Sequence, residues 1–466
     1  MPTYIPLGAA RTVTGSRHLI EHGGVRILVD CGLYQERDLL DRNWSELPVP
    51  ASSIHAVVMT HAHIDHSGWL PVLVRDGFRG KVYATAPTCD IIPILLMDSA
   101  RLQEEDAETK NRRHAREGRT PSRGAVVPLY DEGDVERAVR RREPVEFGKR
   151  TRVVDGPEPV HATWLPAGHI LGAALVLIEI GGKRIVLSGD LGRPHRPLLP
   201  DPAVPPACDL LIVESTYGDR VHDTDHDIPG QLADAIGGAI RDGGKVLMPT
   251  FAVERAQEVL WFLEDLRHAG RIPILPVYLD SPMAVKLVGL FDRHAAVLDS
   301  ETHALHDAGR SPFRFPGLRL CASREDSKAI NGVRGPAVII SGSGMCNGGR
   351  IKHHLNQWID DPASVLLFTG YQAAGTLGRQ IVDGAQRVRL LGGEREVRIR
   401  VRQLQGMSAH ADRTEALAWI RSQPVLPGKI AVIHGGARVA PAFADELQRT
   451  LGVPAHAPEY RERVEI

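Results

Sequence analysis

The chain has 466 residues and a formal net charge of −1; 43% of its residues are hydrophobic and 24% are charged. A chain of this length exceeds one ordinary hydrophobic core, so we expect two domains. The composition is typical of a globular protein. The near-zero charge argues against broad, non-specific affinity for nucleic acid, although it is compatible with a local basic groove.

The sequence gives no sign of export or membrane insertion. No apolar run reaches the ~20 residues that a membrane-spanning helix needs. The N-terminus lacks a basic region followed by an apolar core, so no secretory signal is expected. Five scattered cysteines, an odd number, argue against a disulfide framework. We therefore expect a cytoplasmic protein without membrane contact.

The first 210 or so residues alternate between strand-like and helical patterns. Gly181-Gly182 separates two strand-like runs and is a hairpin signal. Hairpins mixed with helices favour sheets packed face to face with helices outside. The expected strands are 18–20, 25–30, 56–59, 81–84, 161–164, 174–180 and 183–187.

A histidine-rich loop follows the apolar run at 56–59. It reads Thr60-His61-Ala62-His63-Ile64-Asp65-His66, which places three imidazoles and one carboxylate within six residues. These are the ligand types that zinc takes in catalytic sites. A lone histidine is more often an ordinary core or surface residue, but a cluster of four such groups is difficult to explain without a metal.

Three later residues are further candidate ligands. His169, Asp190 and His434 each close an apolar run beside a glycine. Taken singly each is weak evidence, because an aspartate that closes a strand is a common turn residue. Asp30 closes a strand in the same way and has the same alternative. We expect Cys31 to be a small buried residue rather than a ligand.

Residues 101–123 are dense in charge and are expected to form a helix and tail. Oppositely charged pairs four residues apart, such as Glu108 with Arg112, favour a solvated helix face. The functional alternative is a basic lip for RNA.

A new series of strands and helices begins after residue 209. Strands are expected at 245–250, 274–279, 337–341 and 365–369, with a helix at 253–268. Strands that alternate with helices predict a parallel sheet. The chain is then expected to return to the first domain through 397–404.

These motifs together resemble a known family. The order of His61, His63, Asp65 and His66, then His169, Asp190 and His434, resembles the metallo-β-lactamase superfamily. Later motifs are similar to those of its β-CASP branch, nucleases that include the cleavage-and-polyadenylation endonuclease and its bacterial relatives. The motifs that match the branch lie at 213–218, 278–284, 342–345, 370–379 and 408–412.

The resemblance implies an α/β fold, in which an αββα sandwich carries an inserted β-CASP α/β domain with a mostly parallel sheet. The expected boundaries are 1–214 for the first part of the sandwich, 215–385 for the insertion and 386–466 for the remainder.

The resemblance also implies a ligand set for two zinc ions per chain. His61, His63 and His169 would hold one ion. Asp65, His66 and His434 would hold the other, and Asp190 would bridge the two. Paired ions of this kind stabilise both sides of a displacement at phosphorus and supply a nucleophile at neutral pH.

Other site residues follow from the same resemblance. His410 would protonate the leaving 3′-oxygen, and Glu214 would hold and charge that imidazole. Asp30 would orient metal ligands. The turn Gly342-Ser343-Gly344, with Arg379, would contact the substrate's phosphate backbone.

One position departs from the family pattern. An acid commonly follows the last ligand and its glycine, but this chain has Gly436 there. Outer support for His434 is therefore in question.

The expected function is hydrolysis of RNA phosphodiester bonds to 5′-phosphate and 3′-hydroxyl ends, in RNA processing or decay. Single-stranded regions are the expected substrate, endo- and exonucleolytic cutting are both open, and a homodimer is a further expectation. The alternatives are a DNA-directed nuclease, a small-molecule hydrolase of the superfamily and a non-catalytic RNA-binding scaffold. The presence of His434 counts against the DNA enzymes, which tend to carry an apolar residue there. No ligand is lost, which counts against a scaffold.

Overall fold

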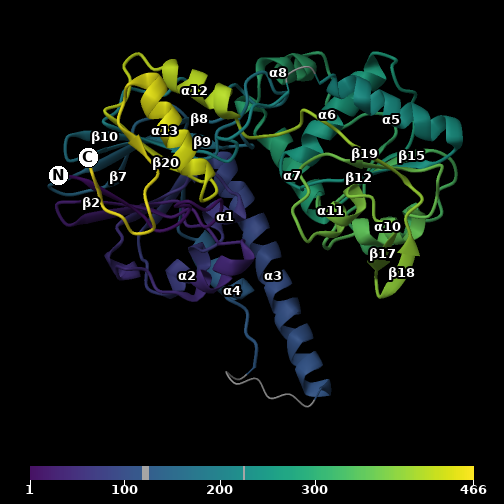
Figure 1. Cartoon of the computed structure of the whole chain (residues 1–466), viewed down its shortest axis with the longest axis horizontal. Coiled ribbons are helices and arrows are strands. Elements are labelled where there is room, and N and C mark those ends of the chain that lie inside the picture. The colour runs from purple at the N-terminus through teal and green to yellow at the C-terminus, as the bar shows by residue number, and fades with distance from the viewer. Residues whose placement is uncertain (118–124, 224–225) are drawn as a thin grey trace. The chain divides into compact units, whose positions relative to one another are not determined.

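The computed structural model describes residues 1–117, 125–223 and 226–466. The chain forms two compact units (Figure 1). Unit 1 consists of residues 1–195, 200–221 and 409–466, and unit 2 consists of residues 196–199 and 222–408. Unit 1 is thus assembled from both ends of the chain.

Unit 1 contains two seven-stranded sheets. The first has the order β22 (Val464–Glu465), β1 (Thr3–Pro6), β2 (His18–His22), β3 (Val25–Val29), β4 (Ala56–Val58), β5 (Lys81–Thr85) and β6 (Arg142–Val145). The second has the order β21 (Ala455–His456), β20 (Lys429–Ile433), β11 (Leu210–Glu214), β10 (Lys183–Leu187), β9 (Ala174–Ile180), β8 (Val160–Pro166) and β7 (Thr151–Val154).

One apolar core fills the space between these sheets. On β11, Leu210 and Ile212 join that core, while Leu211 and Val213 point to the opposite face. This period-two alternation buries both faces of the strand. The outer face of the second sheet packs against α12 (Arg413–Arg421) and α13 (Val439–Leu451). The helices of the first sheet are α1 (Ile64–Ser67), α2 (Leu70–Arg75), α3 (Ala86–Arg116) and α4 (Glu132–Val139). The predicted αββα sandwich is confirmed.

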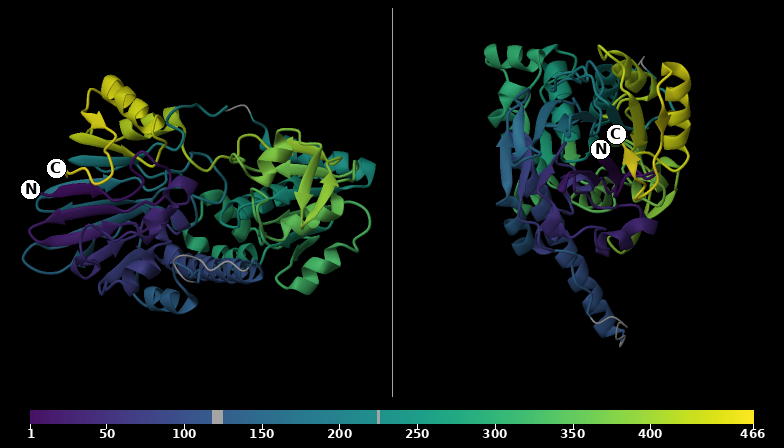
Figure 2. Two further views of the ribbon diagram at one scale, coloured as in Figure 1. Left: turned by 60° about the horizontal axis from the view of Figure 1, so that its bottom comes forward. Right: turned by 90° about the vertical axis from the view of Figure 1, so that its left-hand side faces the viewer.

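The strands expected in this unit all form. The hairpin at Gly181-Gly182 joins β9 to β10 in antiparallel register, with Lys183 opposite Ile180. β1 was not among the expected strands. Its residue Tyr4 pairs with Val464 of β22. This pairing brings the two ends of the chain side by side, as both views of Figure 2 show.

The charge-dense helix is longer than expected because α3 begins at Ala86. Its exposed half carries the predicted pair, with Arg112 Nη2 3.4 Å from Glu108 Oε2. The tail residues 118–123 of that prediction lie outside the described residues. Among the helices that the structure describes, none combines the length and apolar character needed to cross a bilayer.

Unit 2 is built on a six-stranded parallel sheet, as predicted. Its order is β14 (Leu318–Leu320), β13 (Val277–Asp280), β15 (Ala337–Ser341), β12 (Lys245–Pro249), β16 (Val365–Phe368) and β19 (Arg400–Gln403). A separate hairpin consists of β17 (Arg387–Leu390) and β18 (Gly393–Glu396). The helices are α5 (Ile228–Asp242), α6 (Arg255–His268), α7 (Pro282–Arg293), α8 (Ser300–Asp307), α9 (Arg324–Ile330), α10 (Ile351–Trp358) and α11 (Leu377–Val382).

The return of the chain differs from expectation. Residues 397–404 were expected to lead back into the first domain, but they contain β19, which pairs with β16 in unit 2. The reason is packing, since Ile399 belongs to the unit 2 core and Val397 and Val401 pack against it.

Candidate metal centre

The seven predicted ligands gather at strand ends of unit 1. The loop after β4 supplies His61 and His63, and α1 supplies Asp65 and His66. His169 follows β8, Asp190 follows β10 and His434 follows β20. The seven side chains form two groups whose donor atoms lie within 4.8 Å of one another, with Asp190 close to both.

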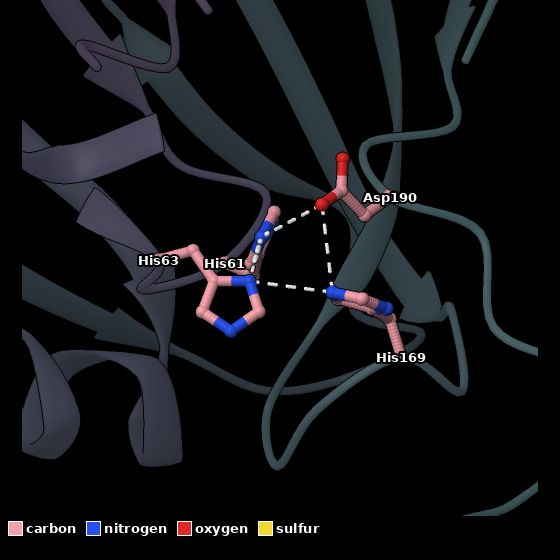
Figure 3. A group of neighbouring side chains, drawn as sticks. All are labelled: His61, His63, His169 and Asp190. Atoms are coloured by element: carbon pink, nitrogen blue, oxygen red, sulfur yellow. Dashed lines mark hydrogen bonds and ion pairs between the residues drawn. The ribbon is translucent and has the colours of Figure 1, made fainter. Parts of the chain in front are cut away.

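The first group consists of three imidazoles around one oxygen of Asp190 (Figure 3). Asp190 Oδ2 lies 3.4 Å from Nε2 of both His61 and His169. His63 Nδ1 lies 3.1 Å from Nε2 of His61 and 3.3 Å from Nε2 of His169. All four donor atoms therefore face one point.

The second group faces the other oxygen of the same carboxylate. Asp190 Oδ1 lies 3.1 Å from Nε2 of His66 and 3.5 Å from Nε2 of His434. These two nitrogens are 3.2 Å apart. Asp65 Oδ2 completes the group, 3.4 Å from Nε2 of His434 and 3.8 Å from Nε2 of His66. Asp190 thus presents one oxygen to each group.

The spacing of the first group fits a tetrahedral zinc ion. Donors about 2.0–2.1 Å from one ion in tetrahedral geometry lie about 3.3 Å from each other. Four of the six separations are 3.1–3.4 Å, and the other two lie within 4.8 Å. In addition, Asp190 Oδ1 is buried and makes no hydrogen bond. A buried carboxylate oxygen of this kind is costly unless a cation faces it.

Outer hydrogen bonds fix the tautomer of four histidines. His66 donates from Nδ1 to Asp30 Oδ2 (2.8 Å), and His169 donates from Nδ1 to the Ala409 carbonyl (3.2 Å). The Thr60 hydroxyl donates to Asp30 and so accepts from Nδ1 of His61 (3.1 Å). With hydrogen on Nδ1, the Nε2 lone pairs converge inward, as metal ligation requires.

The fourth histidine is His434, whose outer support was in question because Gly436 stands where the family commonly has an acid. The Thr216 hydroxyl lies 3.0 Å from Nδ1 of His434 and also bonds the His434 carbonyl. A threonine therefore provides the support that a carboxylate commonly gives in the family. Sequence reasoning did not assign a role to Thr60 or Thr216, although each adjoins a residue that was singled out.

Two backbone features set these side chains in place. Gly189 has a φ of +56°, and a Cβ there would lie 2.7 Å from the Thr60 side chain. Only glycine lets Asp190 approach the histidine loop so closely. His434 itself has a φ of +50°, a conformation uncommon for a residue with a side chain and found preferentially at functional sites.

The electrostatics separate the two groups. Burial lowers the pKa of His61 and His169, and lowers the pKa of His63 to about 3, so these imidazoles are neutral. Burial also opposes charge on His66 and His434, but nearby carboxylates outweigh it and raise both pKa values. The second group therefore attracts positive charge.

A further ion pair lies beside the two groups. His410 Nδ1 is 3.0 Å from Glu214 Oε1, and the His410 ring is 4.5 Å from the His169 ring. Glu214 is buried and also accepts from the N–H groups of Leu191 (2.6 Å) and Thr216 (3.2 Å). Burial lowers the pKa of His410, but the charge of Glu214 outweighs it and raises that pKa to about 9.

The predicted substrate contacts belong to unit 2. Ser343 and Gly344 lie in the turn after β15, and Arg379 lies in the first turn of α11. The Gly378 N–H donates to the Met345 carbonyl (3.1 Å), which joins the helix to that turn. Arg379 pairs with Asp383, Nη2 to Oδ1 at 2.8 Å, and 44% of its side chain is exposed.

Comparison with known sequences identifies the family. The metallo-β-lactamase superfamily profile matches residues 13–250, just over half of the chain. The chain belongs to the metallo-β-lactamase superfamily. The Beta-Casp domain matches residues 256–381, which confirms the predicted branch. The Zn-dependent metallo-hydrolase RNA specificity domain matches residues 394–458, in agreement with the predicted zinc cofactor.

Individual relatives cover most of this metallo-β-lactamase chain. It is 39% identical to ribonuclease TTHA0252 of Thermus thermophilus over 92% of both chains. It is 30% identical to the transcription termination factor FttA of Methanosarcina mazei over 99% of this chain and 71% of that protein. A crystal structure of a protein of unknown function from Enterococcus faecalis V583 shares the fold, with a TM-score of 0.54 and 14% identity over the full length of both chains.

Proposed function

We propose that this chain is a two-zinc ribonuclease that hydrolyses RNA to 5′-phosphate and 3′-hydroxyl products. The observation that carries the proposal is the pair of donor groups that share Asp190, with the ion pair of His410 and Glu214 beside them. The Thermus ribonuclease, at 39% identity, supports RNA as the substrate.

The seven clustered side chains are the proposed zinc ligands. His61, His63 and His169 would hold one ion, and Asp65, His66 and His434 would hold the other, with Asp190 shared between the two groups. When bound, the ions supply a water nucleophile at neutral pH and stabilise charge on the phosphate. Asp65 and Asp190 are held ionised, because imidazole charges lower the pKa of both carboxyl groups against the opposing effect of burial. Asp30 and Thr216 hold ligand rings in orientation.

His410 is the proposed acid for the leaving 3′-oxygen. A ribose alkoxide leaves poorly unless it gains a proton, and a protonated imidazole is a suitable donor at neutral pH. Glu214 fixes Nδ1 of that imidazole and leaves Nε2 to carry the transferred proton. The Leu191 and Thr216 N–H groups donate to Glu214 and so hold its side chain in position beside His410.

The remaining assignments extend this proposal to the whole chain. The inserted domain, predicted at 215–385, corresponds to unit 2, which continues to residue 408. Ser343, Gly344 and Arg379 of this unit contact the phosphate backbone of single-stranded RNA. The basic end of α3 is an alternative contact. RNA processing or decay in the cytoplasm is the proposed setting, where five cysteines remain reduced. A homodimer stays a prediction for sedimentation analysis.

The alternatives make different demands on the same residues. A DNA-directed nuclease would not need His434, yet that histidine is seated in the second group. A small-molecule hydrolase leaves His410 and Glu214 without a role. A scaffold has no need of a complete ligand set. Resemblance to the transcription termination factor FttA makes transcription termination a second setting for the same reaction.

The proposal is tested with zinc-loaded protein and matched RNA and DNA oligonucleotides, labelled at either end. We expect RNA to be cut to 5′-phosphate and 3′-hydroxyl ends. Ends bearing 2′,3′-cyclic phosphate would show that the 2′-hydroxyl is the nucleophile and would overturn the mechanism. Equal or faster cutting of single-stranded DNA would favour the DNA-directed alternative.

A further inference from the structure

The C-terminal edge of the unit 2 sheet carries two exposed aromatic side chains. Phe251 follows β12 and is 47% exposed, and Tyr371 follows β16 and is 61% exposed. β12 and β16 are neighbours in the sheet, which places both residues at the same edge (β12 is labelled in Figure 1). Single exposed apolar side chains are ordinary, whereas exposed aromatic residues gathered at one edge of a sheet are a feature of binding sites.

The backbone around these rings is held firmly. The Thr250 N–H donates to the Ser341 carbonyl (3.0 Å), and the Thr369 hydroxyl donates to the Pro249 carbonyl (3.1 Å). Gln372 Nε2 donates to the carbonyls of both Gly344 (3.0 Å) and Gly370 (3.1 Å). The three loops after β15, β12 and β16 are therefore cross-linked into one surface.

Two glycines lie next to the Phe251 ring, where a side chain would come into contact with it. A Cβ on Gly344 would lie 3.2 Å from ring carbons of Phe251, and a Cβ on Gly370 would lie 3.9 Å from the ring. Phe251 thus lies close to the backbone of both glycines, while 47% of the residue stays exposed. Gly370 is itself exposed and directly precedes Tyr371.

Positive charge lies close to the same edge. Arg379 lies in the first turn of α11, which follows the loop that carries Tyr371, and Lys352 lies in the first turn of α10 (Ile351–Trp358), which follows the turn after β15. Loops at the carboxyl ends of parallel strands are the usual position of ligands in open α/β sheets. Aromatic faces beside cations suit unpaired nucleotides, whose bases stack while their phosphates are neutralised.

We propose that Phe251 and Tyr371 form a stacking platform for unpaired bases of the RNA substrate. The inference rests on the proposed ribonuclease function and specifies how the chain would select single-stranded RNA. Bases in a duplex are stacked on their neighbours and do not present a free face, so a platform of this kind discriminates against double-stranded RNA. Stacking also tolerates any base, which predicts weak sequence preference.

The test measures binding of oligouridylate and of a matched abasic oligonucleotide that keeps the ribose-phosphate backbone. All proteins carry zinc and His410→Ala, which slows cleavage during the measurement. We expect Phe251→Ala and Tyr371→Ala each to weaken binding of oligouridylate roughly tenfold, with almost no change for the abasic strand. Phe251→Trp and Tyr371→Phe keep a ring and should retain binding. Ile274→Ala, which removes an exposed apolar side chain elsewhere in unit 2, is the matched control.

Two results would overturn the platform. One is unchanged binding of oligouridylate by both alanine variants. The other is an equal loss for the two strands, which would assign the rings to contacts with the backbone or with protein. Failure of the ribonuclease proposal is distinguishable, because it appears as absence of RNA cleavage by the unmutated zinc protein, whatever these binding ratios show.

Discussion

The two units differ in the exposure of the side chains that follow their strands. In unit 1 the strand ends are dry and densely bonded, with Asp190 at 2% exposure and His61 fully buried. In unit 2 the strand ends themselves are also buried, but Phe251 and Tyr371 in the loops that follow are 47% and 61% exposed. Reacting groups must be held to within a fraction of an ångström, which needs burial and several partners for each side chain. A surface that takes any single-stranded sequence needs accessible faces instead.

The largest expected effect comes from breaking the bridge in unit 1. Asp190→Ala should lower RNA hydrolysis at least about 10³-fold, because metal stabilisation is worth several kcal/mol. Zinc content, measured by elemental analysis, should fall below the two ions per chain expected for the unmutated protein. Asp76→Ala removes an exposed aspartate of the same unit and is the control. Full activity in Asp190→Ala would refute the shared-ligand assignment.

The second-largest effect is expected from removing His410, the proposed acid. His410→Ala should keep both zinc ions and lose roughly 10²–10⁴ in rate, the usual contribution of a positioned acid. A substrate with sulfur in place of the bridging 3′-oxygen leaves as a stable thiolate, so the defect should shrink sharply with it. The unmutated enzyme is assayed beside it, because zinc binds sulfur. An equal defect on both substrates would assign His410 to positioning, and loss of zinc would make it a ligand.

The pH dependence of the hydrolysis rate tests the role of Glu214. An acid works in its protonated form, so the rate that depends on His410 is present below the pKa of His410 and is lost as pH rises through it. That pKa is raised to about 9, and bound cations lower it from there, so the alkaline limb should fall below pH 9. Glu214→Gln removes the raising charge and should shift the limb to lower pH. If the alkaline limb does not shift in this variant, Glu214 does not set the pKa of the acid.

Loss of one outer hydrogen bond should have a smaller and more local effect. Thr216→Val keeps the shape of the side chain but removes the bond to Nδ1 of His434. Zinc affinity of the second group should weaken about 10–100-fold, with the first group unchanged. Competition with a chelator measures both affinities, and Thr151→Val, elsewhere in unit 1, is the control. Equal weakening at both groups would indicate a general loss of structure.

The smallest effect is expected in unit 2. Arg379 is exposed and already paired with Asp383, so Arg379→Ala should raise KM only a few-fold and leave kcat unchanged. If it contacts one phosphate, the slope of log affinity against log salt should become shallower by about 0.7. Arg387→Ala removes another exposed, paired arginine and is the comparison. An unchanged slope would remove Arg379 from the substrate contacts.

The sequence by itself determined the fold class and the ligand types. Short apolar runs and the double glycine at 181–182 predicted the strands of the sandwich, because both signals are local. The cluster from His61 to His66 predicted a metal, since its ligands lie within one loop. Strand ends beside glycine suggested the three distant candidates His169, Asp190 and His434, and the resemblance then added their grouping around two ions and the family.

Only the tertiary structure decided which atoms meet. The sequence does not state that Thr216 supports His434, or that Asp190 turns one oxygen to each group. These contacts join segments separated by hundreds of residues, and their geometry depends on how two sheets pack. The same reason explains the error at 397–404. This segment was expected to lead back into the first domain but contains a strand of the unit 2 sheet, and a strand's partner is chosen by long-range packing.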